Sequence, residues 1–332
     1  MRILLATDAW YPQINGVVRT LNRVREELEP QGDVFEVLAP HHFRTFPCPT
    51  YPEIRLAVLP QIGLKKRIDA FRPDAIHIAT EGPIGVALRG FCVKHKLPFT
   101  TSYHTRFPEY LSARIPVSAD VGYRFMRWFH RPSSGIMVAT QSMREELQSR
   151  GFERLVDWTR GVDTALFRPE APHALDLPRP VYMYVGRVAV EKNIKAFLDL
   201  DLDGSKVVVG DGPQRAELEA AFPDVHFVGA KQGEDLAAHY ASGDVFVFPS
   251  RTDTFGLVML EALASGMPVA AYPVPGPLDV VDGAGVGILS EDLGSATREA
   301  IKIDREHCRE HALKFSWANC ARMFRDNLQP LD

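Results

Sequence analysis

The stretch VYMYVGRVAVEKNI, residues 181–194, is typical of one repeat of a parallel-sheet fold. Its first five residues are all apolar or aromatic, as expected for a strand that is buried on both faces. A glycine and a short loop follow, and the sequence then takes on a helical pattern. Because parallel strands are usually connected through helices, this order of strand, loop and helix predicts an α/β domain.

The same alternation continues on both sides of this stretch. In the second half, further strands are expected at residues 206–209, 225–228, 245–248 and 269–272, with helices at 193–200, 215–221, 236–242 and 256–265. In the first half, strands are expected at residues 2–7, 34–39, 54–59, 75–79, 98–102 and 135–140. The first helix places Val18, Leu21, Val24 and Leu28 on one apolar face. Two Rossmann-like, doubly wound parallel sheets in tandem are therefore predicted.

Residues 161–180 interrupt the alternation because they are rich in proline and turn-forming residues. We predict an N-terminal domain over residues 1–160, a linker over 161–180 and a second domain over 181–310. A final helix is expected within 311–332, where Leu313, Trp317, Cys320 and Phe324 follow helical spacing. Ligands of open parallel sheets bind beyond the carboxyl ends of the strands, so we expect the site in a cleft between the domains.

The overall composition excludes several classes of protein. The chain has 332 residues and a net charge of −4, which gives no reason to expect nucleic-acid binding. Its four cysteines lie far apart without a C-x-x-C pair, so neither a zinc site nor a disulfide framework is predicted. No apolar run approaches the ~20 residues that cross a bilayer, and the first run is too short for a secretory signal. We expect a cytoplasmic protein with no metal and no cofactor.

Basic residues follow the strand at 181–185. Gly186 and Arg187 come directly after it, and Lys192 precedes the next helix, where backbone N–H groups favour an anion. A planar guanidinium and a mobile ammonium together suit the two phosphates of a diphosphate. The alternative is that Arg187 and Lys192 are two solvated loop residues.

A second loop of this kind lies in VFVFPSRTDTFGLVMLEALASG, residues 245–266. Gly256 removes a side chain where a ligand would approach, and the amides of Phe255, Gly256 and Leu257 are expected to point toward that ligand. Asp253 stands before these amides and is predicted to meet a sugar, whereas Glu261 is predicted to accept hydrogen bonds from ribose hydroxyls. The alternatives are a helix cap for Asp253 and an exposed polar residue for Glu261.

The N-terminal half offers candidates for the other side of the cleft. Gly16 would let backbone amides approach a donor phosphate, unless it is a simple turn glycine. His104 lies beyond a predicted strand, although a lone histidine is more often structural. Asp8, Glu81 and Arg106 are weaker candidates for acceptor contacts.

Arginines and aromatic residues are mixed in the segment Pro108–Arg131, as in helices that bind an anionic membrane surface. The basic members are Arg114, Arg124, Arg127 and Arg131. This segment predicts a peripheral association with the inner face of the membrane. The alternative is that the segment packs against the N-terminal sheet.

In order and spacing, these motifs resemble those of the retaining glycosyltransferases of family 4, and the resemblance covers nearly the whole chain. Asp253 and Glu261 correspond to the E-x7-E motif, and Gly186, Arg187 and Lys192 correspond to the G-R-x-x-x-x-K clamp. Gly16 corresponds to the N-terminal glycine-rich loop, and VGDGP (209–213), FVG (227–229) and GVDTALFRP (161–169) match as well. The sequence departs from the family pattern at Asp253, which replaces a glutamate and reaches one methylene less far.

The resemblance implies a GT-B fold, with two domains facing across a cleft, and a terminal helix that crosses back to the first domain. It also implies metal-independent, retaining transfer of a hexosyl unit from a UDP- or GDP-sugar, with His104 near the anomeric centre and Phe227 and Val228 near the base. The D-T-F-G form resembles bacterial mannosyltransferases and the synthases of sulfoquinovosyl and glucuronosyl lipids, so a glycolipid acceptor is expected.

Two other functions fit the same fold. A sugar-nucleotide 2-epimerase would need no acceptor, and a non-catalytic nucleotide-sugar-binding subunit would only activate a partner. The base, the hexose, the acceptor and the oligomeric state stay open at this stage.

Overall fold

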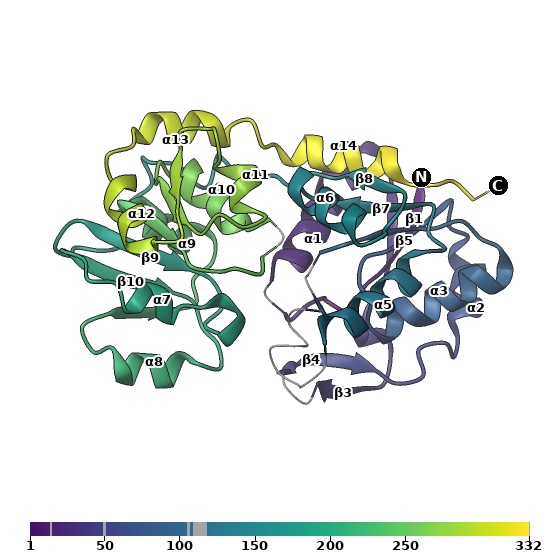
Figure 1. Cartoon of the computed structure of the whole chain (residues 1–332). Coiled ribbons are helices and arrows are strands. Elements are labelled where there is room, and N and C mark those ends of the chain that lie inside the picture. The colour runs from purple at the N-terminus through teal and green to yellow at the C-terminus, as the bar shows by residue number, and fades with distance from the viewer. Residues whose placement is uncertain (14, 49–50, 105–106, 109–117, 254, 332) are drawn as a thin grey trace. The chain divides into compact units, whose positions relative to one another are not determined.

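The structure is a computed structural model that describes the chain except residues 14, 49–50, 105–106, 109–117, 254 and 332 (Figure 1). The chain forms two compact units, and each has its own sheet and core. The first unit contains Met1–Arg160 together with Trp317–Asp332, and the second contains Gly161–Ser316. The chain thus passes between the units twice.

The first unit is built on a six-stranded sheet in which every neighbouring pair is parallel. In spatial order the strands are β2 (Val34–Leu38), β1 (Arg2–Ala6), β5 (Ala75–Ile78), β6 (Thr100–Ser102), β7 (Gly135–Val138) and β8 (Leu155–Asp157). Its α-helices are α1 (Gly16–Leu28), α2 (Leu64–Phe71), α3 (Pro83–His95), α5 (Ala119–His130), α6 (Gln141–Ser149) and α14 (Trp317–Asn327). Short 3₁₀ turns lie at Glu29–Gln31 and Pro40–His42.

Apolar packing explains why these elements form. The residues of β5 and β7 are all buried, which agrees with strands covered by helices on both faces. One cluster of buried side chains packs β1 and β5 against α2 and α3, and another packs β7 against α5 and α6. In α1, the predicted apolar face of Val18, Leu21, Val24 and Leu28 is buried.

The prediction that residues 54–59 form a strand of the parallel sheet is wrong. These residues belong largely to β4 (Tyr51–Ala57), which pairs antiparallel with β3 (Thr45–Cys48) in a separate two-stranded sheet. Arg55 and Val58 are exposed while Ala57 is buried. The described part of β4 is thus only partly buried, whereas an inner strand of a parallel sheet is buried on both faces.

The second unit has a six-stranded parallel sheet of its own. Its order is β11 (His226–Gly229), β10 (Ser205–Val209), β9 (Val181–Val185), β12 (Val245–Phe248), β13 (Val269–Ala271) and β14 (Gly287–Leu289). The helices are α7 (Lys195–Leu198), α8 (Arg215–Ala221), α9 (Gly233–Ser242), α10 (Leu257–Ala264), α11 (Pro277–Val280), α12 (Leu293–Ala300) and α13 (Arg305–Ala312), and a 3₁₀ turn covers Val190–Lys192. The expectation of two doubly wound parallel sheets is confirmed.

Residues 161–180, which were expected to be a linker, pack within the second unit. The amide of Val162 donates to the carbonyl of Phe315, and the amide of Ala174 donates to that of Ala238. The ring of Phe167 is buried and meets Tyr240 edge to face. This proline-rich segment therefore forms part of the core of the unit that follows it.

The order of the strands locates the ligand-binding edge of each sheet. Chain order reverses between β9 and β12 in the second sheet, and between β1 and β5 in the first. At such a reversal the connecting loops leave in opposite directions and open a crevice beyond the carboxyl ends of the two strands. The loops after β9 and β12 contain Arg187, Lys192 and Asp253, and the loops after β1 and β5 contain Asp8 and Glu81.

The last helix, α14, lies beside α1 in the first unit (Figure 1). It buries Trp317, Cys320 and Phe324, while Leu313 lies before the helix and is exposed. The ring of Phe324 contacts His77 and Trp158, with centroids 4.9 and 5.2 Å away. The C-terminal residues are thus a structural part of the first unit.

Replacing Phe324 by alanine should therefore destabilise the first unit by about 3–5 kcal/mol, because it empties a fully buried site. All four tryptophans belong to that unit, so tryptophan fluorescence during urea unfolding reports on it selectively. The exposed neighbour Arg322→Ala serves as the control. Equal unfolding midpoints for the two variants would show that α14 does not support the first unit.

Candidate functional site

An ion pair joins the two loops at the strand-order reversal of the second unit. The ammonium of Lys192, after β9, donates to Oδ1 of Asp253, after β12, at 2.6 Å. Both side chains are mostly buried, with exposed fractions of 20% and 16%. Oδ2 of Asp253 is buried and accepts no hydrogen bond from the described part of the chain. The structure thus brings together two residues that the sequence analysis assigned to separate roles, phosphate clamp and sugar contact.

Two further hydrogen bonds hold these loops against each other. The side-chain amide of Asn193 donates to the carbonyl of Pro249 at 3.1 Å, and the hydroxyl of Thr252 donates to the carbonyl of Glu191 at 3.2 Å. Each bond runs from one loop to the other. Because β9 and β12 are adjacent strands, the two loops leave the sheet side by side and can be linked in this way.

Glycine is required at the end of β9. Gly186 has φ = +153°, and a Cβ there would lie 2.7 Å from the hydroxyl oxygen of Tyr184. That hydroxyl donates to the carbonyl of Arg187 at 2.9 Å, so the chain turns tightly around the tyrosine. Arg187 is partly buried beside this turn. The geometry places the guanidinium-bearing residue directly at the carboxyl end of the central strand.

The turn before α10 also requires a glycine. Gly256 has φ = +81°, and a Cβ there would meet Met259 and Phe248 at 2.9 and 3.0 Å. Phe255 is buried, and Leu257 is the first residue of α10. The N-cap residue of this helix is Gly256, so Asp253 does not occupy the cap position that the alternative assigned to it. Thr254 lies outside the described residues.

Glu261 is a buried carboxylate and not an exposed polar residue, because only 4% of it is accessible. The hydroxyl of Tyr240, on α9, donates to its Oε2 at 2.9 Å. A buried charge of this kind is maintained only where hydrogen bonds offset the loss of water. Phe227 and Val228 lie half-buried on β11, an edge strand that β10 separates from β9. Their contact with a base stays a prediction.

In the first unit, Asp8 is a buried anchor at the carboxyl end of β1. Its carboxylate accepts hydrogen bonds from the amides of Ile84 and Gly85 and from the hydroxyl of Thr80. Burial raises the pKa of Asp8 to about 6. The hydrogen bonds act in the opposite direction and lower this pKa, whereas the repulsion of Glu81 raises it further. Asp8 therefore binds the start of α3 within the protein.

Glu81 faces a buried histidine. Its Oε1 lies 3.3 Å from Nε2 of His130, whose Nδ1 lies 2.9 Å from the hydroxyl of Thr101. His130 is fully buried, whereas the side chain of Glu81 is 13% exposed. Glu81 follows the carboxyl end of β5, whereas His130 is the last residue of α5 and reaches Thr101 within β6. Arg106, the third acceptor candidate, lies outside the described residues.

The start of α1 is capped from within the chain. Oδ1 of Asn15 accepts hydrogen bonds from the amides of Val17 and Val18, each at 3.0 Å. Gly16 itself is exposed at the first position of the helix. The amides of Val17 and Val18 are thus bound by Asn15 in this structure, while the role predicted for Gly16 remains a prediction.

His104 is held by a chain of hydrogen bonds. A terminal nitrogen of Arg160 lies 3.3 Å from its Nδ1, and Oγ of Ser102 lies 2.9 Å from its Nε2. Because a guanidinium can only donate, Nδ1 accepts, and the neutral imidazole carries its proton on Nε2. Burial, the charge of Arg160 and the neighbouring His77 lower the pKa of His104 well below its usual range. His104 is therefore neutral at physiological pH.

Arg160 is a further residue of this site and belongs to none of the motifs described above. It is buried, its guanidinium lies over the ring of Trp158 at 4.3 Å, and it donates to the carbonyls of Trp158 and Thr159. In sequence it lies 56 residues from His104, and only the folded sheet brings β6 near the end of β8. In the sequence, its position directly before the GVD motif was the one local indication that Arg160 belongs to the site.

Comparison with known proteins gives the class of protein. Residues 14–166 match the family described as Glycosyltransferase Family 4, and residues 179–303 match that described as Glycosyl transferases group 1. A GDP-mannose-dependent alpha-mannosyltransferase of Mycobacterium tuberculosis is 30% identical over 87% of this chain and 83% of its own. Sulfoquinovosyl transferase SQD2 of Arabidopsis thaliana is 33% identical over 72% of this chain and 50% of its own.

Solved structures agree on the fold. Sucrose-phosphate synthase of Thermosynechococcus elongatus superposes with a TM-score of 0.80 at 18% identity, covering 98% of this chain and 97% of that one. Alr3699/HepE of Anabaena, solved with UDP and glucose, superposes with a TM-score of 0.71 at 15% identity, covering 98% of each chain. The protein has the GT-B fold and is a glycosyltransferase. It belongs to glycosyltransferase family 4.

Removing the charge of Arg160 should raise the pKa of His104, because a positive neighbour disfavours the imidazolium. In Arg160→Met, ¹³C-labelled histidine signals followed by NMR against pH should show His104 titrating at higher pH than in the unchanged protein. The variant His104→Gln identifies the signal. An unchanged titration of His104 would mean that burial alone keeps this histidine neutral.

Proposed function

We propose that this protein transfers a hexosyl unit from a nucleotide diphosphate sugar to a hydroxyl group of a lipid or glycolipid, with retention at the anomeric carbon. Three relatives support this: two are named for GDP-mannose and sulfoquinovosyl transfer, and a third, 26% identical, is the alpha-monoglucosyldiacylglycerol synthase of Streptococcus pneumoniae. The observation that carries the proposal is the Lys192–Asp253 pair at the strand-order reversal of the second unit.

The charges of these loops suit the departure of a nucleoside diphosphate. Cleavage of the bond between sugar and phosphate leaves negative charge on the departing oxygen. Lys192 and Arg187 place two cations beyond the carboxyl ends of β9 and β12, and Asp253 pairs with the first of them. The hydrogen bonds between the loops hold the ammonium in place before a ligand arrives, so little reorganisation is needed during the reaction.

Asp253 and Glu261 are proposed to hold the sugar and the ribose. Lys192 neutralises Oδ1 of Asp253, which lowers the repulsion between this carboxylate and a nearby phosphate. The buried Oδ2 is then suited to accept a hydrogen bond from a sugar hydroxyl. Tyr240 orients the carboxylate of Glu261, for which we propose the ribose hydroxyls as ligands.

Positive charge develops on the sugar ring as the bond breaks. A neutral His104 beside the ring adds no repulsion, and the hydrogen bonds of Arg160 and Ser102 keep it in one tautomer. We propose that the acceptor attacks from the same face and that the leaving phosphate takes its proton. No side-chain base is then required. A 2-epimerase and a non-catalytic subunit both lack support, because the relatives compared are named as transferases.

We also propose that the protein associates with the inner face of a membrane through the segment Pro108–Arg131. In the described part of the chain, no helix is long and apolar enough to span a bilayer. Near the end of this segment, Arg124 and Arg127 on α5 and the C-cap residue Arg131 share the outer face with Trp128. Residues 109–117 lie outside the described part. Cations on an amphipathic helix attract anionic lipids.

The proposed clamp predicts a loss of activity in Lys192→Ala. Loss of one preorganised cation is expected to slow transfer on the order of 100-fold, or roughly 3 kcal/mol. A thermal-shift panel of UDP- and GDP-sugars first identifies the donor, and transfer to lipid vesicles is then measured by chromatography of the glycolipid product. Lys195→Ala is the matched control, because Lys195 is exposed and paired with Asp199. Similar rates for both variants would overturn the assignment.

Because two cations supply the charge that a metal would provide, we propose that transfer needs no metal. A direct assay of glycolipid formation with the purified protein should give the same rate in EDTA as in Mg²⁺. A strong loss of rate in EDTA that added Mg²⁺ restores would contradict the metal-free mechanism.

A further inference from the structure

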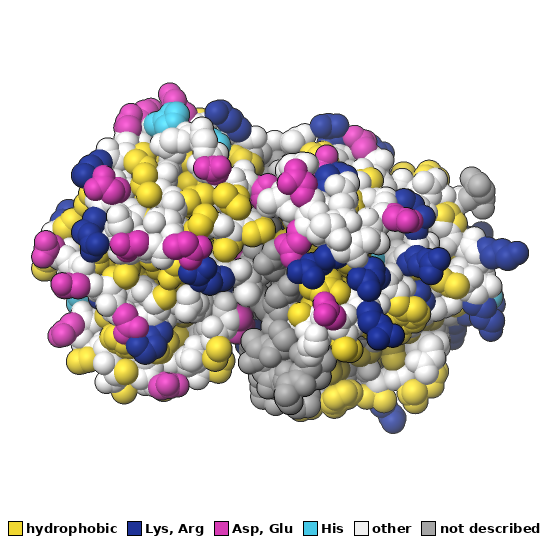
Figure 2. All heavy atoms as spheres, in the orientation of Figure 1, with side chains coloured by type: hydrophobic (Ala, Val, Ile, Leu, Met, Phe, Trp, Pro, Cys, Tyr) yellow, Lys and Arg dark blue, Asp and Glu magenta, His cyan; other side chains and the backbone are white. Residues whose placement is uncertain are grey.

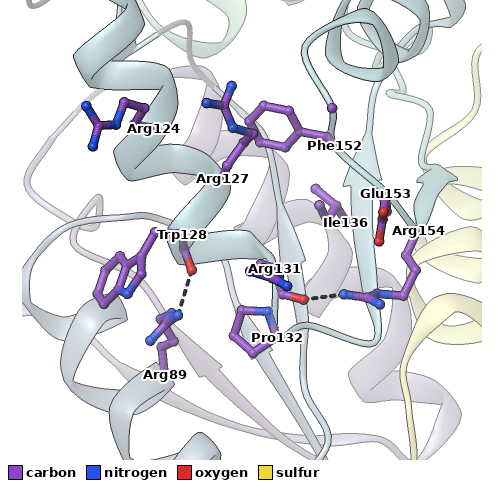
Figure 3. Close-up of a pocket in the computed structure, with 11 residues that line it drawn as sticks. Arg89, Arg124, Arg127, Trp128, Arg131, Pro132, Ile136, Phe152, Glu153 and Arg154 are labelled. Atoms are coloured by element: carbon purple, nitrogen blue, oxygen red, sulfur yellow. Dashed lines mark hydrogen bonds between the residues drawn. The ribbon is translucent and has the colours of Figure 1, made fainter.

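A basic hollow of about 830 Å³ lies on the first unit at the end of α5 (Figure 3). Five arginines and a single glutamate line it, together with Trp128 and a few apolar residues. The arginines are Arg89, Arg124, Arg127, Arg131 and Arg154. They come from three segments of the chain that are far apart in sequence, so the hollow exists only in the folded unit.

We propose that this hollow is a phosphate-binding site that takes the headgroup of an anionic phospholipid. The proposal rests on the membrane association proposed above and names the group that the membrane presents. Arginine is suited to this role because its planar fork of N–H donors matches two oxygens of a phosphate.

The hollow lies at the opposite edge of the sheet from the candidate catalytic residues. Ile136 is at the amino end of β7, and Phe152 and Arg154 come just before β8. Asp8 and His104, in contrast, follow the carboxyl ends of β1 and β6. Since all six strands are parallel, these two sets of residues lie at different edges of the sheet. The hollow is thus a site of its own and not a part of the acceptor site.

Two of the arginines build the wall of the hollow. Arg89, from α3, donates to the carbonyls of Trp128 and Phe129, and its guanidinium stacks on the ring of Trp128 at 3.8 Å. Arg154 donates to the carbonyls of Ser133 and Arg131 (Figure 3). These contacts satisfy carbonyls at the C-terminal end of α5, where cations are favoured. They fix the end of the helix and the position of both guanidinium groups.

Other arginines are directed to solvent. Arg124 and Arg131 are exposed, and no carboxylate pairs with either in the residues that the structure describes. Arg124 lies on α5 and Arg131 is the C-cap residue of this helix, and both lie on the side opposite the buried Tyr123, Met126 and Phe129. On the face shown in Figure 2, Lys and Arg side chains gather over α5 and the nearby part of α3, and acidic side chains are few there. This excess of unneutralised charge favours an anionic ligand.

Trp128 favours a membrane as the source of the phosphate. It is 48% exposed beside the arginines, although its ring is large and mostly apolar. Tryptophans are enriched at the level of lipid headgroups, where an apolar ring and a polar N–H are both accommodated. A site for a small soluble phosphate would have no need of an exposed indole at its rim.

The test compares two double variants that each remove two positive charges. Arg124→Gln with Arg131→Gln changes the hollow but leaves the wall contacts of Arg89 and Arg154 intact. Lys66→Gln with Lys314→Gln is the control, because both lysines are exposed and lie outside the hollow. Co-sedimentation is measured with vesicles of phosphatidylcholine alone, with added phosphatidylglycerol, and with added oleate at the same surface charge.

The unchanged protein and the control should bind phosphatidylglycerol vesicles more tightly than oleate vesicles, and binding should weaken as salt is raised. The hollow variant should bind on the order of tenfold more weakly. Equal binding by the two double variants would overturn the proposal, and so would equal binding to phosphatidylglycerol and oleate. Calorimetry with glycerol 3-phosphate tests for a soluble ligand. If this compound binds and vesicles do not, the hollow is a phosphate site for a soluble ligand, and the lipid assignment is overturned.

Thermal shift with UDP and GDP is measured on the same variants. We expect the shift to be unchanged in the hollow variant, because the proposed donor residues all lie in other loops. A failure of the donor assignment would therefore be distinguishable from a failure of the phosphate site.

Discussion

An ammonium and a carboxylate that come from different strand ends hold the candidate donor loops of the second unit together. Lys192 and Asp253 are 61 residues apart in the chain and 2.6 Å apart in the fold. A partly exposed ion pair of this kind adds little to stability, since desolvation and side-chain ordering offset most of the attraction. Its importance is positional: it keeps a cation and a carboxylate at fixed places where a diphosphate and a sugar would lie next to each other.

The backbone around this pair is shaped to permit it. Gly186 and Gly256 occupy conformations that other residues rarely adopt, and each lies against an aromatic side chain. A third glycine, Gly276, has φ = +95°, and a Cβ there would lie 3.1 Å from the carbonyl oxygen of Phe255. The turns at Gly186 and Gly256 are thus tight, and the loop that contains Gly276 approaches the backbone of Asp253 and Phe255 closely, because side chains are missing at these points. The shape of the site therefore depends on these glycines as well as on the charged side chains.

The first unit uses its polar residues differently at the two edges of its sheet. At the carboxyl edge, Asp8, His104 and Arg160 are buried or partly buried, and each makes hydrogen bonds within the unit. At the amino edge, arginines line an open hollow with little acidic counter-charge. Helix α5 runs from one edge to the other, and its 12 residues span about 18 Å. A membrane contact along this helix would extend from the basic hollow toward the edge that carries the acceptor candidates.

The local pattern of the sequence was sufficient for much of the fold. Strands at 181–185 and 245–248 and the helix at 215–221 were predicted with their observed bounds, because burial on both faces and helical spacing are visible within a few residues. The strand expected at 54–59 was assigned to the wrong sheet, since pairing with β3 depends on residues outside that window. The very short strands β8 and β14 left no clear pattern and were missed.

By itself, the sequence determined the fold class, the family and the residues that carry the charges of the candidate site, because motifs and hydrophobic periodicity are local properties. Only the tertiary structure decided which of these residues meet. The pairing of Lys192 with Asp253, the anchoring of Asp8 at the start of α3 and the contact of Arg160 with His104 all depend on which strands are neighbours. Strand order results from the packing of the whole sheet, so no short stretch of sequence contains it.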